Sequence, residues 1–125
     1  IVLLIYPAFV IGYTWAHVLR SDLKGGRHGP LDAYRHALAS AVVSHTLGEW
    51  AVKLVTTVFE SSGKASNNMD RKNNSIGAAI GGSAESFGEL EPRVRAQVSA
   101  GAELSDEVGQ ITWLPSDRWR DSKLW

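Results

Sequence analysis

A stretch of thirteen residues decides the fold: Gly29-Pro30-Leu31-Asp32-Ala33-Tyr34-Arg35-His36-Ala37-Leu38-Ala39-Ser40-Ala41. Pro30 suits the first position of a helix, and Asp32 then falls in the first turn, where the helix dipole favours an acid. The apolar and alanine-rich residues that follow predict one helix from Pro30 to about Glu60, with Gly48 as its weak point. The glycines just before it, in residues 23–29, predict a loop.

Three further helices are predicted on either side of this one. They cover roughly Pro7–Arg20, Met69–Gly81 and Pro92–Ala100, and the polar segment at 61–68 is expected to be a loop. Gly109–Pro115 has the β-branched and aromatic character of a short strand or extended segment, and residues 116–125 suit a short capped helix. The predicted class is therefore mainly α: a compact helical domain with a short strand or extended segment near the C-terminus.

The composition is that of one globular domain. Of 125 residues, 44% are hydrophobic and 21% charged, so the chain is long enough for a single core and unlike a disordered segment. Its 13 basic and 13 acidic side chains cancel. No nucleic-acid partner is expected, because binding by phosphate neutralisation needs an excess of basic charge. The absence of cysteine excludes disulfides, a thiolate nucleophile and cysteine-ligated zinc.

The segment Ile1–Leu19 contains no Asp, Glu, Lys or Arg. Two interpretations follow: a helix that is buried or covered by a partner, and a helix that inserts in a membrane, since about 20 apolar residues span a bilayer. Residues 1–22 are therefore set apart from a helical, effector-like domain at 23–125. The first residue is Ile1 rather than Met, which indicates a piece of a longer chain.

Two triplets of polar residues share one helical spacing, i, i+3 and i+4: Asp32, Arg35 and His36, and Asp70, Asn73 and Asn74. Each triplet occupies one face, about 100° wide, of its helix. Small residues continue each face, Ala39 and Val43 after the first triplet and Gly77 and Gly81 after the second. We expect these strips to pack together and to bring both triplets into one partly buried site, because buried polar groups need mutual hydrogen bonds.

These residue types suit acid–base or ion-assisted chemistry. His36 is the expected general acid or base, oriented by Asp32, while Arg35 binds an anionic group or clamps the structure. The carboxylates also allow a divalent metal ion held by Asp32, Asp70 and Glu60, with His36 in support.

A purely structural interpretation competes with these two. Asp32 and Asp70 could each be only a first-turn acid, and Arg35 could be a surface ion-pair partner. The pair Asn73-Asn74 is typical of a cap or turn. The polar cluster would then lock the helices together without any chemistry.

The same residues carry a family resemblance. The matching elements, in order, are Gly29–Ala41, Phe59-Glu60, Met69-Asp70-Arg71-Lys72-Asn73-Asn74-Ser75-Ile76-Gly77 and Gly109–Leu114. They resemble an uncharacterised bacterial domain family with an N-G-x-x-D-A-[FY]-R-H-A helix, an A-H-E element, an M-D-x-x-N-N-x-x-G element and a closing G-x-[IL]-x-W-[LI] segment. Phe59 stands where the family has the histidine of A-H-E. His28 stands where it has the asparagine of N-G, and could swing over the site.

Members of this kind tend to be terminal domains of secreted or polymorphic-toxin-type proteins. The resemblance therefore implies a secreted antibacterial effector, delivered into the cell envelope of a target bacterium, with an immunity protein as partner. It implies these site residues: Asp32, Arg35, His36, Glu60, Asp70 and Asn74.

The resulting expectation is a toxin domain that acts as a hydrolase on a cell-envelope substrate. The expected catalytic residues are His36, Asp32, Glu60 and Asp70, and the expected substrate-binding residues are Arg35, Asn73, Asn74 and His28. The alternative is a non-enzymatic effector that contacts membranes through Ile1–Leu19 and uses the polar cluster only for structure. A structural interaction domain is the third class.

Overall fold

The structure of the chain is a computed structural model that describes residues 2–59 and 65–120. Within these ranges the chain forms α1 (Val2–Arg20), α2 (Pro30–Leu47), α3 (Glu49–Phe59), α4 (Ala65–Ser83) and α5 (Leu90–Ser99), followed by two short strands, β1 (Ala102–Glu103) and β2 (Thr112–Trp113). Short 3-10 helices precede α5 and follow β2, at Phe87–Glu89 and Ser116–Arg118. The predicted mainly α class, with a short strand near the C-terminus, is confirmed.

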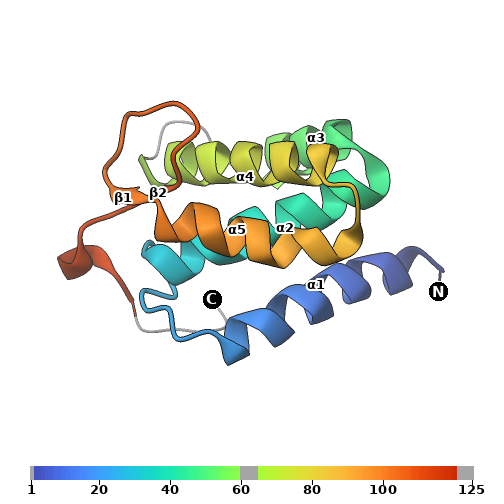
Figure 1. The fold of residues 1–125 in the computed structure, drawn as a ribbon, viewed down its shortest axis with the longest axis horizontal. Helices are drawn as coiled ribbons and strands as arrows, with labels where there is room; N and C mark the ends of the chain where they lie inside the picture. The colour runs from blue at the N-terminus through green and yellow to red at the C-terminus, as the bar shows by residue number, and fades with distance from the viewer. Residues whose placement is uncertain (1, 60–64, 121–125) are drawn as a thin grey trace.

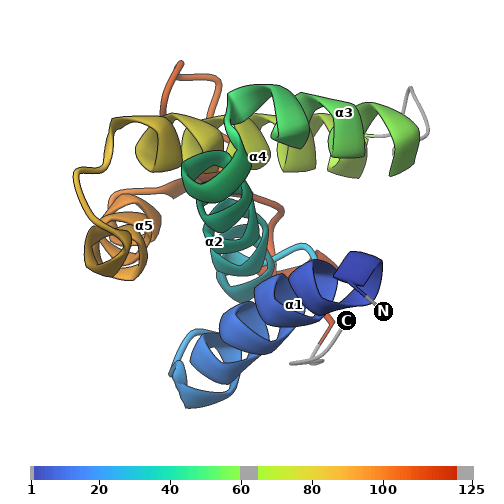
Figure 2. The same ribbon diagram turned by 90° about the vertical axis from the view of Figure 1, so that its right-hand side faces the viewer.

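Helix α2 is the centre of the domain. It contacts α1, α3, α4 and α5, and Figures 1 and 2 show α1 on one side of it and α3 with α4 on the other. Its residues Leu31, Leu38 and Val42 are almost fully buried, and they join a core that includes Val94 of α5 and Ile111 next to β2. The first turns of α2 are therefore enclosed on nearly all sides, including its polar residues Asp32 and Arg35.

Several helix boundaries differ from the sequence predictions. Helix α2 ends at Leu47, because Gly48 takes φ of 108°, a backbone conformation that glycine adopts at little cost, and the chain resumes as α3. Helix α4 begins at Ala65, so the loop predicted at 61–68 is wrong for residues 65–68. Helix α1 begins at Val2 and contains Pro7 rather than starting there. Of the capped helix predicted at 116–125, the described part is the 3-10 turn, and residues 121–125 lie outside the described residues.

Helix α1 packs on the domain through one stripe. Val10, Thr14 and Val18, spaced at i, i+4 and i+8, are buried. Leu3 and Leu4, near its start, are 87% and 73% exposed. One face of α1 is therefore buried against the domain, and its start is exposed. Among the helices that the structure describes, none is long and apolar enough to cross a membrane.

Helices α2 and α4 run in the same direction, and contacting residues keep a constant separation in the sequence. Ser40 Oγ donates to Asn74 Oδ1 at 3.2 Å, and one turn later Ser44 Oγ donates to the carbonyl of Ala78 at 2.6 Å. Both pairs are separated by 34 residues in the sequence. Figure 1 shows the two helices running in the same direction.

Glycines on α4 make this close approach possible. A Cβ at Gly77 would lie 2.2 Å from the carbonyl oxygen of Ala37, and a Cβ at Gly81 would lie 2.3 Å from that of Ala41. The predicted glycine strip is thus confirmed. The strip predicted for α2 is wrong, because Ala37 and Ala41 face the glycines instead of Ala39 and Val43.

The C-terminal segment is tied to α4 by one buried side chain. Asn73 Nδ2 donates to the Thr112 carbonyl at 2.7 Å, and the Thr112 N–H donates to Asn73 Oδ1 at 3.0 Å. Strand β2 pairs in parallel with β1, with Ala102 opposite Thr112. This anchor fixes residues 102–114 beside the N-terminal half of α4.

Candidate functional site

Three side chains from α2 and α4 converge at one point. Asp32 and His36 lie one turn apart on α2, and Asp70 lies in the second turn of α4. His36 Nε2 is 3.4 Å from Asp32 Oδ1 and 3.7 Å from Asp70 Oδ1. One potential ligand atom of each residue lies within 4.8 Å of the other two. The packing of α2 on α4 therefore brings members of both polar triplets into one cluster, which we call the Asp–His–Asp triad.

The start of α2 holds Asp32 in place. Gly29 precedes the helix in an extended conformation and Pro30 is its first residue. Asp32 Oδ2 accepts the backbone N–H of His28, in the loop that precedes the helix, at 2.9 Å. Its other oxygen, Oδ1, faces His36. Asp32 thus combines the role of a first-turn acid with a place in the triad.

The electrostatics of the triad favour a positive charge between two carboxylates. Burial raises the pKa of Asp32, but the neighbouring His36 imidazole, the backbone N–H of His28 and the guanidinium of Arg35 outweigh this effect and lower that pKa to about 2. Burial lowers the pKa of His36, but the nearby carboxylates of Asp32 and Asp70 outweigh this effect and raise that pKa. The His36 side chain is 35% exposed, so this position is open to solvent.

Arg35 holds Asp32 from behind. Its Nη2 donates to Asp32 Oδ1 at 2.9 Å and to the carbonyl of Gly26, and its Cζ lies 5.6 Å from the centre of a Trp15 ring. Only 8% of its side chain is exposed. Of the two expected roles, an anion-binding group and a structural clamp, this position fits the clamp, because a guanidinium buried on these partners cannot reach a substrate without breaking them.

Asn74 lies one turn beyond Asp70 on α4 and next to Ser40 of α2. It is half-buried, and its amide oxygen accepts from Ser40 Oγ. Because the oxygen is engaged, the amide NH₂ is the group that Asn74 would present to a substrate. Its substrate-binding role stays a prediction.

Two other predicted substrate-binding residues do not reach the triad with their side chains. Asn73 is fully buried and bound to Thr112, so its position is structural. His28 contacts Asp32 through its backbone N–H rather than its imidazole, and its Nδ1 is buried without a hydrogen-bond partner among the described residues. Burial lowers the pKa of His28. The imidazole of His28 is therefore not a member of the Asp–His–Asp triad.

The predicted metal set was Asp32, Asp70 and Glu60 with His36 in support. The structure brings Asp32 and Asp70 together with His36 as the third potential ligand. Glu60, the remaining member of the predicted catalytic and metal sets, lies outside the described residues.

Two partners of the site were not among the predicted site residues. Ser40 stands four residues after His36, and this spacing places both on the same face of α2. Trp15 reaches Arg35 from α1. Nothing in the local pattern of either helix indicates that contact, because it depends on how α1 crosses α2.

The fold and site define a mainly α-helical domain with a carboxylate–histidine centre between two parallel helices. The chain belongs to the family described as Domain of unknown function (DUF6973), whose model matches residues 6–100 and so extends from α1 to the end of α5. No curated protein and no solved structure matches the chain. The family carries no assigned activity, and any function must be inferred from the site.

Proposed function

We propose that this chain is the hydrolase domain of a secreted bacterial effector, and that it acts on a cell-envelope substrate with a divalent metal ion held by Asp32, His36 and Asp70. The observation that carries the proposal is the convergence of the three ligand atoms within 4.8 Å. Two carboxylates and one imidazole form a ligand set that suits zinc and related divalent ions.

The distances within the triad favour an ion over direct hydrogen bonds. The Nε2 atom of His36 can carry one proton and donate it to one acceptor, yet two carboxylate oxygens face it, at 3.4 and 3.7 Å. Both distances exceed the usual upper limit of about 3.2 Å for an N–H···O hydrogen bond. A metal ion about 2.0–2.2 Å from each ligand would engage all three atoms at once.

The surroundings of Asp32 support the same interpretation. Metal-ligating carboxylates are commonly oriented by hydrogen bonds from outside the ligand set. The guanidinium of Arg35 and the backbone N–H of His28 provide such bonds to Asp32, one to each oxygen. Because one donor comes from the loop before α2 and the other from the next turn of the helix, they hold the carboxylate in place beside His36.

The residues then divide into two groups. Asp32, His36 and Asp70 hold the ion, and Asn74 donates from its amide to the substrate. A bound divalent ion would supply polarisation of the scissile group and a lowered pKa for an attacking water. The exposed fraction of His36, 35%, leaves one side of the centre accessible to substrate and water.

Acid–base chemistry without an ion is the competing mechanism for the same residues. The raised pKa of His36 favours its imidazolium form, which can donate a proton, with Asp32 as the orienting carboxylate. Removal of metal ions distinguishes the two mechanisms, because only the ion-assisted reaction depends on them.

The effector class and the envelope target are supported by the sequence. The ordered motifs from Gly29 to Leu114 resemble secreted toxin-type domains, and the balance of 13 basic and 13 acidic residues offers no excess positive charge for a nucleic-acid substrate.

The test combines toxicity with turnover. The chain would be directed to the periplasm of a susceptible bacterium, and the purified chain would be incubated with isolated envelope fractions, with and without EDTA. We expect Asp70→Asn to abolish both growth inhibition and hydrolysis, and EDTA to abolish hydrolysis until Zn²⁺ or Mn²⁺ is added. Asp22→Asn, at an exposed position before α2, is the matched control and should behave as wild type. Full activity of a folded Asp70→Asn variant would disprove the proposal.

A membrane-active effector remains the second candidate, because α1 exposes Leu3, Leu4 and Ile5. That function would not need the triad. It predicts that Asp70→Asn retains full toxicity and that the purified chain releases dye from anionic lipid vesicles.

A further inference from the structure

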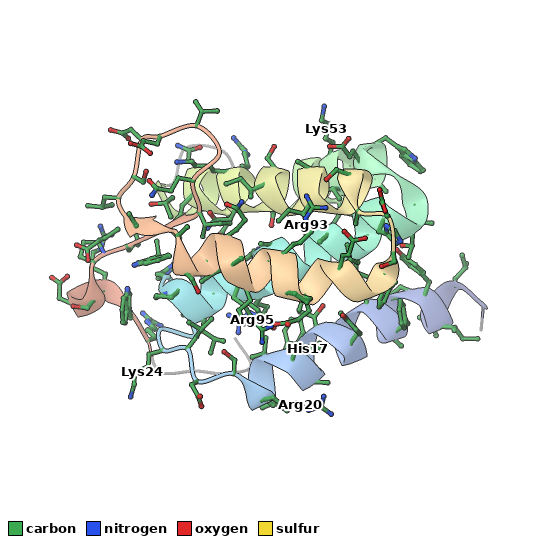
Figure 3. All side chains as sticks on the ribbon, viewed as in Figure 1. His17, Arg20, Lys24, Lys53, Arg93 and Arg95 are labelled. Atoms are coloured by element: carbon green, nitrogen blue, oxygen red, sulfur yellow. The ribbon has the colours of Figure 1, made fainter. Side chains whose placement is uncertain are left out.

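We infer that the segment 114–120 is a positioning element of the candidate site, and that Trp119 holds Asp32 in place by packing on the loop that precedes α2. This loop, residues 25–29, contains three glycines, and we call it the glycine loop. Figure 3 shows Lys24, the residue before the loop, with its side chain pointing away from the helices. The inference rests on the proposed function where it predicts how tightly the triad binds a metal ion.

The glycine loop holds Asp32 through its side chain and its backbone. The backbone N–H of His28 donates to Asp32 Oδ2 at 2.9 Å. Arg35, which donates to Asp32 Oδ1 at 2.9 Å, is itself bound to the carbonyl of Gly26. The backbone N–H of Asp32 donates to the carbonyl of Gly25 at 3.1 Å. The position of the Asp32 carboxylate therefore depends on the shape of this loop as well as on α2.

The glycine loop has a backbone conformation that needs support from outside. His28 has φ of 68° and Gly25 has φ of 74°, both in the left-handed region. Glycine adopts this region readily, whereas it is unfavourable for a residue with a Cβ and persists where the surrounding structure holds it. Contacts from another part of the chain are therefore needed to keep the N–H of His28 directed at Asp32.

The segment 114–120 supplies such contacts through its backbone. The N–H of Leu114 donates to the carbonyl of His28 at 2.8 Å, so both polar backbone groups of His28 are bound. Next to this contact, Arg27 and Arg120 form an antiparallel bridge and exchange two backbone hydrogen bonds, each of 3.1 Å. Backbone hydrogen bonds thus join the segment to two consecutive residues of the glycine loop, one of which binds the triad.

Trp119 adds packing against the glycines of the loop. A Cβ at Gly25 would lie 3.0 Å from Cδ2 of Trp119, and a Cβ at Gly29 would lie 2.9 Å from the same atom, so the ring occupies space that side chains would need. The indole Nε1 donates to the carbonyl of Leu114 at 2.6 Å, which fixes the ring beside the residue that binds His28. Removal of this ring leaves the glycine loop without its packing partner on that side.

The first test measures amide hydrogen exchange in the metal-free full chain. Trp119→Ala is compared with wild type and with Trp50→Ala, a matched control because Trp50 is 64% exposed on α3. We expect the N–H of His28 to exchange at least about tenfold faster in Trp119→Ala, because the loop opens locally. The N–H of Val94, in the core of α5, should change much less, which separates opening of the loop from unfolding of the whole domain.

The second test measures the affinity for Zn²⁺ by isothermal titration calorimetry, which a loss of packing alone would not change in a folded chain. Loss of contacts that orient a metal ligand weakens metal binding about 10–100-fold, so we expect about tenfold weaker binding by Trp119→Ala and unchanged binding by Trp50→Ala. Trp119→Phe keeps a ring against the glycines and should show both changes to a smaller extent. It takes the place of Trp119→Ala if that variant does not fold.

Two results would overturn the inference in a folded variant at position 119. One is unchanged exchange of the His28 N–H, and the other is faster exchange with unchanged affinity for Zn²⁺. A wild-type chain that binds no Zn²⁺ refutes the proposed function alone, because the exchange of the His28 N–H then decides by itself whether the segment 114–120 holds the glycine loop on Asp32.

Discussion

Asn73 and Asn74 are adjacent in the sequence but differ in burial and in hydrogen bonding. Asn73 is fully buried and exchanges two hydrogen bonds with the backbone of Thr112, while Asn74 is half-buried beside the triad. We expect Asn73→Ala to lower the free energy of unfolding by about 2–4 kcal/mol, because it leaves a buried N–H and a buried carbonyl unsatisfied. Asn74→Ala should cost less than about 1 kcal/mol and reduce activity instead. Urea denaturation and an activity assay of both variants check this, and equal losses of stability would contradict it.

Arg35 offers a second prediction at the scale of one residue. Arg35→Met retains much of the side-chain volume but leaves the buried carboxylate of Asp32 without its guanidinium. Removing one partner of a buried ion pair costs about 3–5 kcal/mol, so a loss at the lower end of that range is expected, since His28 and His36 still contact Asp32.

A double-mutant cycle supplies the control for Arg35. If the cost arises from an uncompensated charge, Asp32→Asn should destabilise the Arg35→Met background much less than it destabilises wild type. Additive effects of the two substitutions, measured by urea denaturation, would show that the ion pair is not the cause.

At the scale of whole elements, the approach of α4 to α2 depends on Gly77. A Cβ there would lie 2.2 Å from the backbone carbonyl oxygen of Ala37, which cannot move without displacing α2. Gly77→Ala should therefore lower stability by about 3 kcal/mol or more, at the upper end of the cost of overpacking. Gly12→Ala on α1 is the control, because a Cβ there meets nothing within 4 Å, and it should raise stability by about 0.5–1 kcal/mol. Thermal unfolding of both variants measures the contrast, and a tolerated Gly77→Ala would show that the helices can separate.

The same pair of helices shows how far the sequence could predict the site. The spacing of Asp32 and His36, and the glycines of α4, predicted which faces are polar and which helices approach. They could not predict the register. Spacing alone would align Asp32 with Asp70, whereas the structure places His36 next to Asp70, in the register of 34 residues that Ser40 and Asn74 share. Register depends on side-chain packing across the whole contact, which no local pattern encodes.

Helix boundaries were less predictable for a similar reason. Gly48 was recognised as a weak point, but whether a helix bends, continues or ends at a glycine depends on what its next turn can pack against. Here the turn lets α3 fold back along α4 (Figure 2).

At the scale of the whole molecule, polar contacts between helices add to the packing of the core around α2. Tyr6 of α1 bonds Thr46, and Tyr34 donates to Glu91 of α5 at 2.7 Å. The guanidinium of Arg93 on α5 reaches Ser83 at the end of α4. These ties close the domain around α2 and hold the α2–α4 contact, and with it the triad, in a fixed geometry.

The hydrogen bond from Tyr34 to Glu91 predicts how the free energy of unfolding depends on pH under alkaline conditions. Burial, together with the hydrogen bond and charge of Glu91, raises the pKa of Tyr34 above its usual value of 10. The folded state then retains a proton that the unfolded state loses, so the contribution of Tyr34 is complete below about pH 10 and is lost as pH rises beyond it.

Tyr34→Phe removes this titration. At neutral pH it should be less stable than wild type by about 1–2 kcal/mol, because Glu91 loses a partner. Above pH 10 the wild type should lose stability faster, so that the two free energies of unfolding approach each other. Tyr13, whose pKa burial also raises, titrates in both proteins and cancels in the comparison. Urea denaturation at intervals from pH 7 to pH 11 measures the difference. A constant difference over this range would mean that Tyr34 does not keep its proton when folded, and that the link between α2 and α5 is not the buried hydrogen bond described above.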